Sequence, residues 1–108
     1  MSLTVTSDVV EGIARITLVG EVDSGSVGKF KDEVDKVAKV SPKEIVLCVK
    51  ELSFMSSAGL RVIVFAKQKL GVNVPIYVVK PQEMIVDTLK KTGLLHSVSI
   101  IDEHNKCD

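Results

Sequence analysis

Residues 45–49 have the sequence Ile45-Val-Leu-Cys-Val49, in which every position is apolar and most are β-branched. A continuous apolar run of this length is typical of a strand that is covered on both faces, as in a parallel sheet. We therefore expect a central strand here, with helices lying on either side of it. This strand decides the fold class, because parallel strands are joined by helical crossovers.

Four further segments have strand patterns, and the clearest covers residues 13–19. Ala14, Ile16 and Leu18 share one face of that segment, and other side chains alternate with them. Such alternation is typical of a half-buried strand. Residues 3–6 form a shorter expected strand, joined to it by a turn through residues 8–12, and residues 20–23 follow it as a polar loop. Two later strands are expected at residues 74–79 and 97–101.

Three segments have helical spacing, over residues 26–40, 57–70 and 81–91. The first carries one apolar stripe, with Phe30 and Val34 at its centre, and charged residues cover the rest of its surface. It ends before Pro42, because the residue preceding a proline is disfavoured in helical geometry. Gly71 and Gly93 follow the other two segments and are expected to end them.

The predicted order is therefore ββαβαβαβ, an α/β fold. Alternating strands and helices predict right-handed crossovers and a mostly parallel sheet that begins with an antiparallel hairpin. We expect a single domain over residues 1–101 and a polar C-terminal tail over residues 102–108. A chain of 108 residues has room for one hydrophobic core.

The charge balance and the apolar runs exclude some classes of partner. Fourteen basic and fourteen acidic residues cancel, so we expect neither nucleic acid nor an anionic membrane as the main partner. The N-terminal residues lack the basic and apolar regions of a signal peptide. All apolar runs are short, and we expect no membrane span.

The chain has two cysteines and two histidines. We expect Cys48 to be a small core residue and Cys107 to be an exposed thiol, as suits a protein of the reducing cytosol. His96 and His104 do not have the spacing of a metal site. We expect no metal and no cofactor.

Two loops are expected at the carboxyl ends of strands, where open α/β sheets bind their ligands and partners. They are residues 20–23 and residues 52–60, and the second places Ser56 and Ser57 at the start of a helix. The free N–H groups there favour a serine as a cap and also favour an attached phosphate. Ala58 and Gly59 keep the first turn small, which would let a partner approach closely. The residues alone leave both interpretations of the serines open.

The segment Phe54-Met-Ser-Ser-Ala-Gly-Leu60 resembles the pattern F-M-D-S-S/T-G-L of STAS domains, specifically of bacterial anti-sigma factor antagonists. The resemblance covers nearly the whole chain. It includes the Gly20-Glu-Val-Asp23 loop, the strand before the motif and the Lys91-Thr-Gly-Leu94 segment. The motif and the predicted order of strands and helices together make it fairly specific.

The resemblance implies a cytoplasmic regulator that is not an enzyme. Its partners would be an anti-sigma factor with serine kinase activity, which phosphorylates Ser57, and a PP2C-type phosphatase, which reverses that step. Ser56 stands where the family usually has aspartate, and Cys48 where it often has Asp or Asn, so Ser56 is a second candidate for phosphorylation. The residues implied in partner binding are Asp23, Phe54, Met55, Ser56, Ser57, Gly59 and Leu60.

Three other functions stay open at this point. An enzyme with Ser57 as nucleophile would need a base and oxyanion donors, and the segment is not a G-x-S-x-G elbow. A nucleotide-binding module is possible in this family, although the chain has no phosphate-binding glycine loop. A STAS scaffold that acts on a partner unrelated to sigma factors would have the same sequence features.

Overall fold

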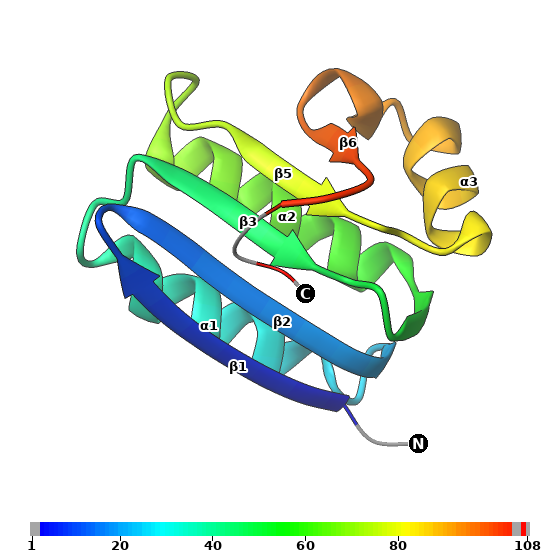
Figure 1. The fold of residues 1–108 in the computed structure, drawn as a ribbon. Coiled ribbons are helices and arrows are strands. Elements are labelled where there is room, and N and C mark those ends of the chain that lie inside the picture. Colours follow the sequence, from blue (N-terminus) through cyan, green and yellow to red (C-terminus); the bar gives the residue numbers. More distant parts are fainter. Residues whose placement is uncertain (1–2, 105–106, 108) are drawn as a thin grey trace.

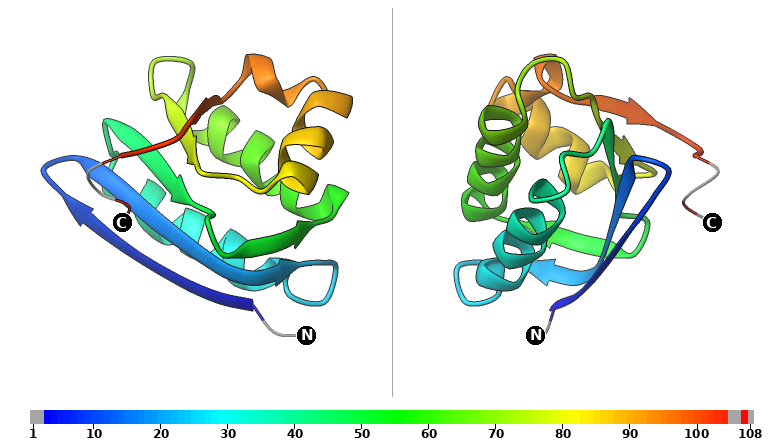
Figure 2. Two further views of the ribbon diagram at one scale, coloured as in Figure 1. Left: turned by 45° about the vertical axis from the view of Figure 1, so that its right-hand side comes forward. Right: turned by 90° about the vertical axis from the view of Figure 1, so that its left-hand side faces the viewer.

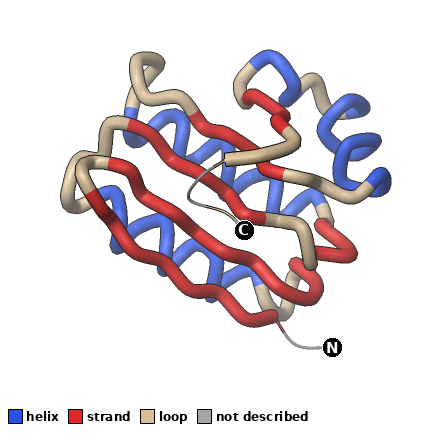
Figure 3. Tube along the Cα trace, viewed as in Figure 1, coloured by secondary structure: helices blue, strands red, loops and turns tan. Residues whose placement is uncertain are grey.

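The computed structural model describes residues 3–104 and 107, which form one mixed sheet with helices against one face (Figures 1 and 3). The strands are β1 (Leu3–Val10), β2 (Ile13–Val22), β3 (Glu44–Cys48), β4 (Leu52–Met55), β5 (Ile76–Val79) and β6 (Ser99–Ile101). The helices are α1 (Val27–Ala38), α2 (Ser57–Leu70) and α3 (Glu83–Lys91), with a 3₁₀ turn, η1, at Leu94–His96. Among the described residues, no helix has the length and apolar character that a membrane span requires.

The sheet confirms the predicted fold class. Its order is β1-β2-β3-β5-β6, with β1 antiparallel to β2 and the other neighbours parallel. The hairpin turn lies at Glu11 and Gly12, which both have positive φ. The expected helix at residues 57–70 is confirmed at both ends, and Gly71 follows it with φ 91°.

The prediction missed one strand. Residues 52–55 form β4, which continues the line of β3 along the edge of β2 after a break at residues 49–51. β2 runs to Val22, past the expected end at residue 19, and its register shifts between Gly20 and Glu21. Gly20 has φ 110°, which favours glycine, and the strand bends there. A segment of four residues is too short to show a strand pattern in the sequence.

The expectation of helices on both faces of β3 is wrong. Figure 2 shows α1 and α2 on one side of the sheet and the C-terminal segment on the other. The main core lies on the helix side, and α3 contributes Ile85 and Leu89 to it. A smaller cluster of Val46, Cys48 and Val79 lies on the opposite face, where Cys107 packs against it. β3 is thus covered on both faces, as its sequence requires, and the described residues that pack against its second face include Ile101 and Cys107.

Cys48 is a buried core residue, as expected, but the expectation that Cys107 is an exposed thiol is wrong. Cys48 and Cys107 form a disulfide across 59 residues of sequence. The cysteines were too far apart in sequence for their pairing to be inferred, and residues 102–108 carried no strand or helix signal that would have predicted where they lie.

The alternation in β2 predicts the cost of removing its core side chains. Ile16 is fully buried, so Ile16→Ala should lower the free energy of unfolding by about 2–5 kcal/mol, measured by urea denaturation. Val72→Ala is the control, since Val72 is 85% exposed, and it should change stability by less than about 0.5 kcal/mol. Equal effects of the two substitutions would contradict this assignment of the core.

Candidate functional site

The two loops singled out in the sequence lie side by side. β4 pairs in parallel with the end of β2, with Met55 opposite Val22. The Ser56 N–H then donates to the Val22 carbonyl over 2.9 Å. Asp23 follows Val22 directly, so the segments that begin at Asp23 and Ser56 leave the sheet at the same edge.

Ser56 and Ser57 have different roles at the start of α2. Ser56 is the N-cap, with extended backbone geometry, and its Oγ accepts a hydrogen bond from the Ala58 N–H at 3.3 Å. Ser57 is the first residue of the helix and is exposed. Its hydroxyl makes no hydrogen bond to any residue in the described part of the chain. The capping role thus belongs to Ser56, and the Ser57 hydroxyl is accessible.

Gly59 is required by packing inside the protein. A Cβ on this residue would lie 2.6 Å from Met55 Cγ and 2.9 Å from Val22 Cγ1. The first turn of α2 therefore packs closely against β2 and β4, and Gly59 is buried. The interpretation that Gly59 leaves room for an approaching partner is wrong, because the missing side chain faces the core.

The Asp23 carboxylate organises the loop between β2 and α1. Its Oδ1 lies 3.1 Å from the Ser26 Oγ and accepts backbone hydrogen bonds from Gly25 and Ser26, each at 2.9 Å. The Ser26 hydroxyl and these N–H groups lower the pKa of Asp23 from its ordinary value of 3.8, because they stabilise the carboxylate. Asp23 thus fixes the shape of the loop and places a negative charge at this edge of the sheet.

The residues expected to bind a partner divide into accessible and buried ones. Phe54 is 37% exposed and Ser57 is exposed, while Asp23 and Ser56 are half-buried. Met55, Gly59 and Leu60 are buried in or beside the core. These three can shape the site, but their side chains do not form its surface.

The sequence analysis missed a groove beside Ser57. It has a volume of about 370 Å³ and lies between α1 and α2, beginning at Ala58. Val27 and Phe65 give it apolar walls, and Lys31 and Arg61 give it positive charge. The Lys31 ammonium lies 4.8 Å from the centre of the Phe65 ring, a favourable cation–π distance. Exposed apolar residues in both helix patterns were the available signal, but the pairing of α1 with α2 was needed to locate it.

The site offers no arrangement for metal binding. Within residues 3–104 and 107, no group of three or more His, Cys, Asp or Glu side chains is placed to hold a metal ion. The site presents the accessible Ser57 hydroxyl at the N-terminus of α2. The Phe54 side chain, the Asp23 carboxylate and the groove between α1 and α2 lie around it.

Comparison with known proteins identifies relatives of the chain. The family model of the STAS domain matches residues 4–107, a range that includes most of the segment expected to be a tail. The anti-sigma-F factor antagonist RsfB of Mycobacterium tuberculosis is 27% identical over 78 residues. That alignment covers 72% of this chain and 64% of RsfB, so the chain matches less than two thirds of this curated relative.

Solved structures show the same fold. An anti-sigma factor antagonist from Mycobacterium paratuberculosis superposes with a TM-score of 0.87 at 21% identity, over 97% of this chain and 90% of that one. Unphosphorylated SpoIIAA gives 0.73 at 19% identity, over 97% and 92%. The phosphorylated form of SpoIIAA from Bacillus gives 0.69 at 18% identity, over 94% and 93%.

The close packing of Gly59 predicts a large effect for a small substitution. Gly59→Ala should lower the free energy of unfolding by about 1–3 kcal/mol, because the added methyl group overpacks the junction of α2, β2 and β4. Gly28→Ala in α1 is the matched control, since its Cβ would meet nothing within 4 Å. That control should raise stability by up to about 1 kcal/mol through helix propensity. Similar effects of both substitutions in urea denaturation would contradict the packing argument.

The hydrogen bonds to Asp23 predict its titration. Ser26→Ala should move the pKa of Asp23 back toward 3.8, measured by NMR of the side-chain carboxyl carbon, and Ser24→Ala should leave it unchanged. Because the folded-state pKa lies below that of the unfolded chain, the carboxylate stabilises the fold above pH 3.8. This contribution is lost as the pH falls through the folded-state pKa. An unchanged Asp23 pKa in Ser26→Ala would show that the hydroxyl is not its main cause.

Proposed function

The chain belongs to the STAS domain family, and from this we propose that it is an anti-sigma factor antagonist whose partner binding is switched by phosphorylation of Ser57. The unphosphorylated protein binds an anti-sigma factor that is also a serine kinase, and a sigma factor is released. The kinase then transfers phosphate from ATP to Ser57, and the complex dissociates. A PP2C-type phosphatase restores the binding form.

The observation that carries this proposal is the difference between the two serines. Ser56 Oγ is engaged as the cap of α2, whereas Ser57 Oγ is exposed and makes no hydrogen bond to a described residue. Ser56 is half-buried, so its hydroxyl is less accessible to a kinase than the exposed hydroxyl of Ser57. Ser57 is therefore favoured over Ser56 as the phosphorylated residue.

The surroundings of Ser57 suit a phosphate that leaves the fold intact. The N-terminus of α2 provides the positive end of the helix dipole, which attracts an anion. Arg61 is exposed and lies one turn along the same helix, at the spacing where side chains meet. A phosphoserine at residue 57 is thus stabilised locally, and its effect is confined to the surface.

The partner is expected to cover Ser57 together with its neighbours. Phe54 and the groove between α1 and α2 provide apolar area on two sides of the hydroxyl. Asp23 provides a charge on the adjoining loop. Adding about −1.5 to −2 charges at the centre of this surface forces desolvation of the phosphate and repels acidic groups of the partner. Met55, Gly59 and Leu60 act by holding these elements in place.

The proposed partners also place the protein in a compartment. Sigma factors, their antagonists and ATP-dependent serine kinases act in the bacterial cytoplasm, and we propose that this chain acts there too. The balanced charge of the chain is consistent with a protein partner.

Mass spectrometry of the protein from its native cells tests the proposed site directly. Trypsin releases residues 51–61 as one peptide that holds Ser53, Ser56 and Ser57. We expect phosphate on Ser57 in a fraction that changes between growth and stress, and none in the same peptide from Ser57→Ala cells. Phosphate on Ser56 alone would contradict the assignment to Ser57. An unmodified peptide in all conditions would favour a scaffold that binds its partner constitutively.

The switch itself is tested with variants of Ser57 and the co-purified kinase. In the presence of ATP, Ser57→Ala should stay bound, and Ser57→Asp should bind at least about 10-fold more weakly than the unphosphorylated parent. Both affinities can be measured by calorimetry. Ser53→Ala is the matched control, because Ser53 is an exposed serine on the neighbouring strand, and it should respond to ATP as the parent does. Equal affinities of all variants with ATP would contradict the switch.

A further inference from the structure

The sheet face opposite the helices carries an apolar patch, which we call the open-face patch. It consists of Val46, Cys48, Tyr77 and Val79 on the two central strands. Val46 and Val79 are almost fully buried, although none of the described helices packs over them. Cys107 packs against this cluster together with Ile13 and Ile101, on the side of the sheet opposite α1 and α2 (Figure 2).

Residues 102–104 and 107 are joined to the sheet by one covalent bond and by non-covalent contacts. Cys107 is joined to Cys48, and their Cα atoms are 5.7 Å apart, within the usual range for a disulfide. His104 Nε2 lies 3.3 Å from Glu44 Oε1, and the His104 ring lies 6.0 Å from that of Tyr77. The contacts of His104 with Glu44 and Tyr77 are non-covalent. The disulfide is therefore the strongest tie between the segment and the patch.

We propose that the Cys48–Cys107 disulfide is a redox-controlled latch, which holds the C-terminal segment over the open-face patch when oxidised and releases it when reduced by a cellular dithiol. This goes beyond the proposed phosphorylation switch. It concerns the opposite face of the sheet and requires no partner of Ser57.

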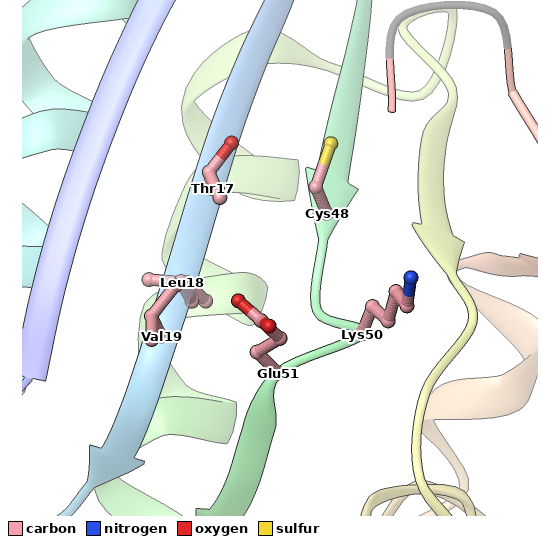
Figure 4. A pocket seen from close by; sticks show the side chains of 6 residues that line it. All are labelled: Thr17, Leu18, Val19, Cys48, Lys50 and Glu51. Carbon is pink, nitrogen blue, oxygen red and sulfur yellow. The ribbon is translucent and has the colours of Figure 1, made fainter. Parts of the chain in front are cut away.

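The position of the two sulfurs favours exchange at Cys107. Cys107 is half-buried, whereas Cys48 is 9% exposed. Figure 4 shows Cys48 beside Thr17, at the rim of a hollow of about 130 Å³ that Lys50 and Glu51 also line. A dithiol thiolate attacks the Cys107 sulfur, and Cys48 leaves as a thiolate.

The chemistry balances with a dithiol as reductant. Its first sulfur forms a mixed disulfide with Cys107, and its second sulfur attacks that bond to release the Cys107 thiolate. Both protein thiolates end as thiols, taking up the two protons that the dithiol loses. Two electrons pass to the protein, and the reductant becomes a disulfide.

The proposed cytoplasmic location supports a reversible role. Disulfides in that compartment are mostly transient or redox-sensing, with hyperthermophile proteins as the main exception. Those proteins use such bonds as permanent staples, so the two roles make opposite predictions about reduction of the folded protein.

The single tyrosine gives a direct readout of the patch. Tyr77 is the only tyrosine and the chain has no tryptophan, so its fluorescence reports this face alone. The oxidised protein is incubated with reduced dithiothreitol, without denaturant, and trapped with N-ethylmaleimide. We expect two labels per chain and an increase of about twofold or more in acrylamide quenching of Tyr77, as for a local opening. Circular dichroism should remain that of the folded protein.

Cys107→Ser is the matched control, since it replaces only the sulfur of the tail cysteine. It should show the higher quenching at once, and dithiothreitol should not change it further. Failure of dithiothreitol to reduce the folded protein would overturn the latch in favour of a permanent staple. The latch would also be overturned if Tyr77 were quenched equally in the oxidised parent, the reduced parent and Cys107→Ser. Neither readout depends on Ser57 or its kinase, so the two proposals fail separately.

Discussion

The burial of β3 on both faces is the constraint on which the rest of the structure depends. Every side chain from Ile45 to Val49 is buried, so each face of this strand needs a cover. Helices α1 and α2 cover one face and create the groove next to Ser57. On the other face, Cys107 packs against the strand and is joined to Cys48 by the disulfide. The proposed partner site and the proposed latch thus follow from two solutions to the same packing requirement.

Local sequence patterns predicted the elements well wherever the pattern was long. The alternation in β2 and the helical spacing of residues 57–70 identified both elements, and the order of elements gave the mostly parallel sheet. Two features depended on contacts distant in sequence. β4 has only four residues and is defined by its pairing with the end of β2. The cover over β3 was assigned to helices because apolar periodicity carries no information about which segment packs against a buried strand.

The candidate site was located from sequence but not resolved in detail. The rule that parallel strands end at one edge brought Asp23 and the two serines together correctly. Sequence alone left Ser56 and Ser57 equivalent, because both are good capping residues. They differ in backbone conformation, because Ser56 is extended and the helix begins at Ser57. Likewise, the family pattern identified Gly59 but not why a glycine is needed there, which is the close packing of Met55 and Val22 against it.

The same geometry explains why the site can carry a switch without endangering the fold. The groups that fix the junction of β2, β4 and α2 are Gly59, Met55 and the Ser56 cap, and all of them point inward or are engaged. Ser57 adds no described side-chain hydrogen bond to this junction, so a change in its charge does not weaken it. Asp23 is likewise satisfied by its own loop and stays ionised at neutral pH. A charge added at Ser57 therefore acts on whatever approaches from outside, which is the property that a reversible partner switch requires.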